Sequence, residues 1–146
     1  MALGAGRPAA AKEALEEGLA RLPQDPSARA PGEEARWRYA HGAALAALHE
    51  SDAADRELRA ALAGATRDWI RGRVHGELGR LAEQAGNHVD ALQEYRLAER
   101  LCRQDRDAEC VEDVAALINP HRSVRLGDGP PGTFRATRPG SMEQRP

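Results

Sequence analysis

The chain has 146 residues, enough for one domain with a modest core, and a formal net charge of −2. A charge this close to zero excludes a global field that attracts nucleic acid or anionic lipid, so we expect neither nucleic acid nor membrane as a partner. Much of the 41% hydrophobic content is alanine, and only five residues are aromatic. Such a thin core, without alternating apolar runs, is typical of helices rather than of a sandwich or barrel.

The basic residues are almost all arginine, with Lys12 as the exception. Because the arginines interleave with acidic residues, we read this as the coding bias of a GC-rich, bacterial genome rather than as phosphate recognition. The sequence has no apolar run long enough to span a membrane and no visible export signal. We therefore expect a cytoplasmic protein, or a periplasmic one if the true N-terminus carries a signal peptide that is missing here.

The first predicted helix runs from about residue 8 to residue 22. Leu15, Gly18 and Leu22 lie on one apolar stripe, and acidic residues separate them. Pro8 suits a first helical turn, and Pro23 ends the helix. We interpret the segment either as an N-terminal capping helix or as half of a truncated helical repeat.

A helix hairpin is predicted over residues 33–63. Trp37 and Leu45 lie on the inward face of its first helix, Ser51 or Asp52 can cap the second, and Gly64 ends it. The residues expected to form the contact between these two helices are Gly42, Ala54, Leu58 and Ala61.

A second hairpin is predicted over residues 68–103. Gly86 can close its first helix in a left-handed conformation. Asn87 can cap the next helix, with Asp90 completing a partial capping box. The residues expected at this contact are Leu78, Gly79, Ala91, Tyr95 and Ala98. A shift of 37 residues lays the small and large contact positions of the first hairpin on those of the second.

This spacing, from Leu78-Gly79 through Gly86 to Ala98, resembles the tetratricopeptide repeat (TPR), a unit of two antiparallel helices of about 34 residues. The resemblance implies an all-α fold, a short TPR-like α-solenoid of about five to six helices. The predicted TPR-like helical domain spans residues 1–118, with single helices at about 8–22 and 107–118 flanking the two hairpins.

The last predicted helix begins at a cap formed by Asp105 or Asp107 and ends at Asn119-Pro120. The 28 residues from Asn119 onward hold nine Pro or Gly and carry a net charge of +3. This composition predicts a disordered tail over residues 119–146, with a short docking motif around Phe134 as the alternative.

The two cysteines, Cys102 and Cys110, flank the turn before the last helix. Without a visible export signal we expect a reducing compartment and two buried free thiols. A disulfide closing this small loop is the alternative, and a redox- or metal-responsive role is a remoter one. The histidines are scattered, and no nucleophile or phosphate-loop motif occurs, so neither a cofactor nor enzymatic activity is expected.

The TPR resemblance implies that the first helices of the hairpins line a concave surface. The expected lining residues are Arg36, Tyr39, Ala40, Ala43 and Ala47 in one hairpin and Arg73, Gly76, Glu77, Arg80 and Glu83 in the other. From them we take Arg36, Tyr39, Arg73, Glu77 and Arg80 as candidate partner-binding residues. The predicted function is a non-catalytic scaffold or protein–protein interaction module that binds a partner peptide or helix. The alternative is a structural subunit whose incomplete terminal repeats associate with a second copy or a larger TPR assembly.

Overall fold

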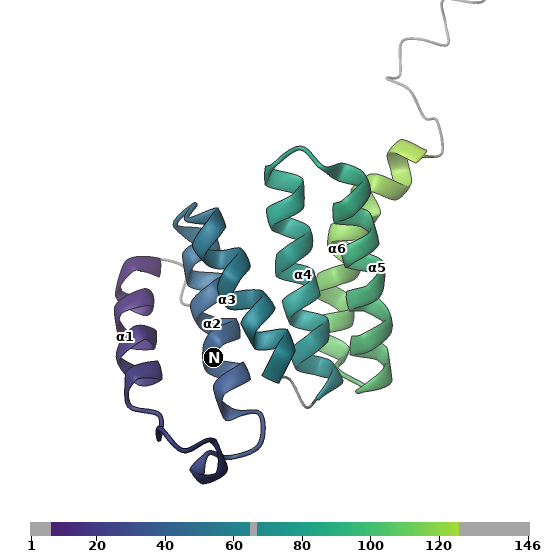
Figure 1. The fold of residues 1–146 in the computed structure, drawn as a ribbon. Coiled ribbons are helices and arrows are strands. Elements are labelled where there is room, and N and C mark those ends of the chain that lie inside the picture. The colour runs from purple at the N-terminus through teal and green to yellow at the C-terminus, as the bar shows by residue number, and fades with distance from the viewer. Residues whose placement is uncertain (1–6, 65–66, 126–146) are drawn as a thin grey trace, which may run out of the picture.

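A computed structural model of the chain describes residues 7–64 and 67–125. Every regular element in these residues is helical, as the sequence predicts. Figure 1 shows the helices following one another in chain order, from α1 at one end to α5 and α6 at the other. None of the described helices is long and apolar enough to cross a membrane. The elements are α1 (Pro8–Ala20), the short 3-10 helix η1 (Pro26–Ala28), α2 (Glu33–Ala47), α3 (Ser51–Gly64), α4 (Asp68–Gln84), α5 (His88–Gln104) and α6 (Ala108–Arg125).

The two hairpins, α2–α3 and α4–α5, are built around the same kind of contact. A Cβ atom added at Gly42 would lie 2.8 Å from Cγ of Leu58, and one added at Gly79 would lie 2.4 Å from Cε1 of Tyr95. Each glycine therefore leaves room for a large side chain of the following helix, and the backbones approach closely. The flanking small residues are fully buried in both hairpins: Ala54, Ala61, Ala91 and Ala98.

Three helix ends share one turn geometry. His49, Gly86 and Arg106 have φ values of 63°, 84° and 58°, all in the left-handed region. After each of them, a backbone N–H donates to the carbonyl five residues back, which is the long bond of a Schellman motif. The three bonds are Glu50 to Leu45 at 3.0 Å, Asn87 to Ala82 at 2.8 Å and Asp107 to Cys102 at 2.9 Å.

The cap predicted for α5 differs in one respect. Asn87 stands at the N-cap position, but its side chain makes no capping hydrogen bond. Its backbone φ of −90° and ψ of 71° differ from the β-region conformation that directs a cap side chain toward the first turn. The helix start is held instead by the turn on its N-terminal side, through the left-handed Gly86.

Apolar side chains pack into separate clusters along the row of helices. One cluster joins α2 and α3 to α4 and includes Ala35, Leu58 and Val74. Another joins α5 to α6 and includes Tyr95 and Val114. These clusters hold α4 between the two ends of the molecule, so residues on α2, α4 and α6 are fixed relative to one another.

The predicted end of the last helix at Asn119-Pro120 is wrong, because α6 continues to Arg125 with Pro120 inside it. Proline cannot donate a backbone hydrogen bond, so the carbonyl of Ala116, four residues back, loses its helical donor. Ala116 is exposed, so water can satisfy this carbonyl. Residues 119–125 of the predicted disordered tail are therefore helical. Residues 126–146, which contain the rest of that tail and the candidate motif around Phe134, lie outside the described residues.

Candidate functional site

An open groove of about 820 Å³ lies along the row of helices. Its walls come from α1, α2, α4 and α6, and the small side chains of Ala40 and Ala43 leave space on the α2 side. A second pocket of about 50 Å³ shares Tyr39 and Glu77 with the groove and reaches α6. Because helices supply every wall, the groove is built on rigid elements rather than on loops.

The structure brings all five candidate partner-binding residues to this groove: Arg36, Tyr39, Arg73, Glu77 and Arg80. Of the other expected lining residues, Gly76 lines the smaller pocket. The expectation was wrong for Ala47 and Glu83, which do not line the groove. Ala47 is exposed at the C-terminal end of α2. Glu83 accepts a hydrogen bond from the hydroxyl of Tyr95 at 2.7 Å, which turns it toward α5.

Aromatic side chains are concentrated in the groove. Three of the five aromatic residues of the chain line it: Trp37, Tyr39 and Trp69. Trp37 is half-buried because its ring also packs against Gly18 of α1. A Cβ atom added at Gly18 would lie 2.4 Å from Cζ3 of Trp37. Trp69 is a groove residue that is absent from the expected lining residues. Its position one helical turn before Arg73 is the signal that could have placed it on this face.

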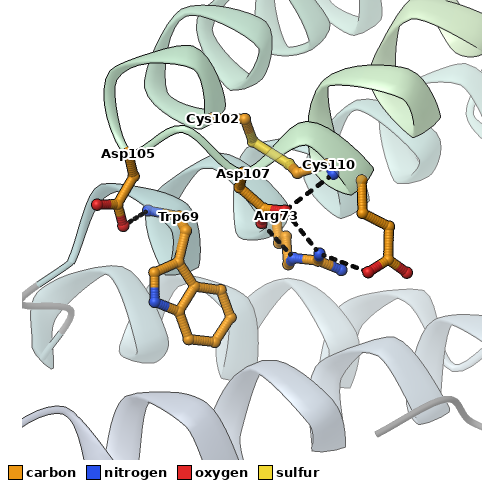
Figure 2. Close-up of a disulfide and its surroundings, with 7 residues drawn as sticks. Trp69, Arg73, Cys102, Asp105, Asp107 and Cys110 are labelled. Carbon is orange, nitrogen blue, oxygen red and sulfur yellow. Dashed lines mark hydrogen bonds and ion pairs between the residues drawn. A yellow bond between two sulfur atoms is a disulfide. The ribbon is translucent and has the colours of Figure 1, made fainter.

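Arg73 is held in place by acidic residues at the start of α6. Its Nε donates to Oδ2 of Asp107 at 3.0 Å and its Nη2 to Oδ1 at 3.2 Å, and Glu109 lies 3.6 Å away. Figure 2 shows this arrangement beside Trp69, whose ring centroid is 5.9 Å from the guanidinium carbon. Burial would raise the pKa of Asp107, but the bonds from Arg73 and from the Cys110 amide outweigh it, and the pKa is lowered.

The turn between α5 and α6 connects three helices. Asp107 caps α6 by accepting from the amide of Cys110 at 3.2 Å, as predicted. Asp105 accepts from the amide of Trp69 at 3.0 Å, so it caps α4 across a gap of 36 residues. The same short turn therefore fixes the start of α4, the start of α6 and the guanidinium of Arg73 (Figure 2).

The expectation of free thiols was wrong, because Cys102 and Cys110 form a disulfide (Figure 2). The left-handed residue Arg106 folds the chain back so tightly that the two Cα atoms lie 5.8 Å apart, within the usual range for a disulfide. Both cysteines are buried, with exposures of 0% and 2%. Buried sulfur is typical of a structural cross-link rather than of a thiol-exchange site.

Glu77 lies at the centre of the groove wall on α4 and is half-buried. Burial raises the pKa of its carboxyl group, and Arg80 opposes the shift. Burial also raises the pKa of Tyr39, a second groove residue, and the charge of Glu77 adds to that rise. Within residues 7–64 and 67–120, the structure gives Glu77 neither a hydrogen-bond donor nor an ion-pair partner. Its carboxylate is thus an acceptor that the described part of the fold leaves unused.

In the described part of the chain, no group of three or more His, Cys, Asp or Glu side chains is arranged to hold a metal ion. Comparison with family models, with curated proteins and with solved structures found no match for this chain.

Proposed function

We propose that this chain is a TPR-like, non-catalytic interaction module that binds a segment of a partner protein in the groove between α2, α4 and α6. The observation that carries the proposal is the concentration of Trp37, Tyr39 and Trp69 in one groove of a chain that is otherwise poor in aromatic residues. Tryptophan, tyrosine and arginine are the residues most enriched at protein–protein hot spots, and this groove combines all three.

The dimensions of the groove support a peptide or helix as the ligand. A volume of about 820 Å³ accommodates several side chains of a bound segment. Its walls are helices connected by a packed core, so binding would require little ordering of the module itself. An array of first helices that presents a preformed concave face is the binding mode expected of TPR-like repeats.

A structural subunit that stacks through its terminal helices receives less support. Among the residues whose side chains are described, Val89 is the large hydrophobic residue that is exposed, at 71%. It lies in the first turn of α5, not on α1 or α6. Stable stacking of solenoid ends buries apolar surface, and the described parts of the terminal helices do not present a large apolar patch for it.

Two alanines one helical turn apart on α2 provide a matched test. Ala43 lines the groove, whereas Ala47 lies outside it. We expect Ala43→Gln to place a long neutral side chain in the groove and to block the partner, while Ala47→Gln leaves the groove open. The measurement is quantitative affinity capture from the host organism with wild type and both variants, each checked for an unchanged helical signal.

Proteins retained by wild type and by Ala47→Gln, but lost with Ala43→Gln, would support binding in the groove. Equal capture by all three forms would place the interaction elsewhere on the molecule and refute this function for the groove.

A further inference from the structure

The charges that line the groove are unevenly available to a ligand. Four acidic residues line it, namely Glu33, Glu77, Glu109 and Asp113, against three arginines. One of those arginines, Arg73, already donates twice to Asp107 and lies 3.6 Å from Glu109. Because Asp107 neutralises Arg73, four acidic residues and two arginines remain, and negative charge predominates in the groove.

The remaining arginines do not neutralise the interior. Arg36 and Arg80 are exposed, as are Glu109 and Asp113, so water screens all four of these charges and leaves the half-buried Glu33 and Glu77 as the less screened ones. Glu77 is half-buried and lacks a donor in the described part of the structure. Leaving a partly buried carboxylate without a hydrogen-bond donor costs free energy, and a ligand that supplies the donor recovers that cost.

The aromatic residues favour the same kind of ligand. The faces of Trp37, Tyr39 and Trp69 attract cations through the ring quadrupole, most strongly for tryptophan. Trp69 already shows this preference, since the Arg73 guanidinium lies over its ring at 5.9 Å. An aromatic groove with an unused carboxylate combines a cation–π surface with a charge-assisted hydrogen-bond acceptor.

We propose that the partner segment is basic, and that one of its Arg or Lys side chains enters the groove, pairs with Glu77 and lies against the aromatic residues. This inference rests on the proposed function, because it identifies the chemistry of the segment that the groove binds. The three arginines of the groove, taken alone, would instead favour an acidic partner.

The test uses the full chain and a library of random peptides about a dozen residues long. Both tryptophans of the chain line the groove, so their emission reports occupancy directly. We expect selected peptides to share an Arg or Lys next to an apolar residue. Replacing that Arg with citrulline, or that Lys with acetyl-lysine, keeps the aliphatic part of the side chain and removes its positive charge. The affinity should then fall by about tenfold or more.

The matched variants are Glu77→Gln in the groove and Glu112→Gln, which removes an exposed carboxylate of α6 that does not line the groove. Glu77→Gln should weaken binding of the selected peptide by about tenfold, and Glu112→Gln by less than about twofold. Glu77→Gln should leave the unfolding midpoint unchanged or higher, because burial already disfavours the charged form. This second readout separates lost recognition from lost folding.

Three outcomes would contradict the inference. Selected peptides without a cation, or with affinity unaffected by Glu77→Gln, would refute the basic partner while the interaction function stands. Failure to select any peptide that changes tryptophan emission would refute the proposed function together with the inference. An emission change that depends on protein concentration without peptide would assign the groove to a second copy of the chain.

Discussion

The two hairpins use the same backbone plan with different side chains. A shift of 37 residues superposes Gly42 on Gly79 and Leu58 on Tyr95. Gly42 packs against Leu58 in the first hairpin, and Gly79 packs against Tyr95 in the second. The second hairpin adds a polar connection, since the Tyr95 hydroxyl donates to Glu83 at 2.7 Å. Packing of a large residue on a glycine is therefore the shared requirement, and the identity of the large residue is adjustable.

The same shift reveals a difference in the core. Leu78 of the second hairpin is replaced by His41 in the first, and both residues are buried. The two ring nitrogens of His41 are buried without a hydrogen bond in the described structure, although each lies 3.5 Å from a carboxylate, one of Glu16 and one of Glu57. The first hairpin thus contains an imperfectly satisfied polar group where the second has an apolar one.

The largest expected effect concerns the glycine contacts. Tyr95→Ala should destabilise the fold by about 4 kcal/mol and Leu58→Ala by about 3 kcal/mol, because both side chains are fully buried. Tyr95→Phe isolates the bond to Glu83 and should cost about 1 kcal/mol. Urea unfolding followed by circular dichroism measures all three. An unchanged midpoint for either alanine variant would contradict the shared packing plan.

The next effect concerns the turn that ties the second hairpin to α6. Asp107→Asn should cost about 2 kcal/mol at neutral pH, because it removes charge-assisted bonds to Arg73 and weakens the α6 cap. The pKa of Asp107 is lower in the folded chain than in the unfolded one. Its stabilisation is therefore fully present above about pH 4 and is lost as the pH falls through the folded-state value.

Unfolding of wild type and Asp107→Asn at several pH values measures this dependence. The difference between the two should shrink toward zero as the pH is lowered below about 4. Asp113→Asn, which removes an exposed carboxylate nearby on α6, is the control for a change in net charge. A difference that persists unchanged in acid would show that the charge of Asp107 is not what stabilises the turn.

The sequence predicted the features that depend on local spacing. Helix positions and the Gly79–Tyr95 contact follow from small and large residues at helical intervals, and the left-handed turn follows from Gly86. The features that it missed arise from contacts between distant elements. Asp105 caps α4 from 36 residues away, and no local pattern indicates such a pairing.

The same limit explains what the sequence did not predict at the site. Arg73 lines the groove, as its helical position predicts, but its bond to Asp107 depends on where α6 lies. The disulfide depends on the left-handed residue Arg106, whose conformation its side chain does not predict. Position on a helix face could be inferred from spacing, whereas the partner of each charge required the packed structure.

The third prediction concerns the buried histidine. His41→Leu gives the first hairpin the residue that the second one has at this position. It should stabilise the fold by about 1 kcal/mol, since it removes two buried nitrogens without hydrogen bonds and keeps a similar volume. The reciprocal change, Leu78→His, should destabilise by about 2 kcal/mol. A loss of stability with His41→Leu would show that the contacts of His41 to Glu16 on α1 and Glu57 on α3 stabilise the fold.

The smallest effect concerns the turns, where Gly86 has a left-handed backbone without strain and His49 and Arg106 have one at a cost. Exchanging these residues tests whether the three turns are equivalent. His49→Gly and Arg106→Gly should each stabilise the fold by about 0.5 kcal/mol, because the relief of the left-handed strain slightly exceeds the added flexibility of the unfolded chain. Gly86→Ala should cost about 1 kcal/mol, because alanine is strained in the left-handed conformation that glycine adopts freely. A Cβ atom at this position would have no heavy atom within 4 Å, so the cost is conformational rather than steric.

Unfolding in urea resolves differences of this size when the variants are measured side by side. If His49→Gly instead destabilises the fold, the His49 side chain makes a contribution in the first hairpin that Gly86 does not make in the second, and the turns are alike in backbone only.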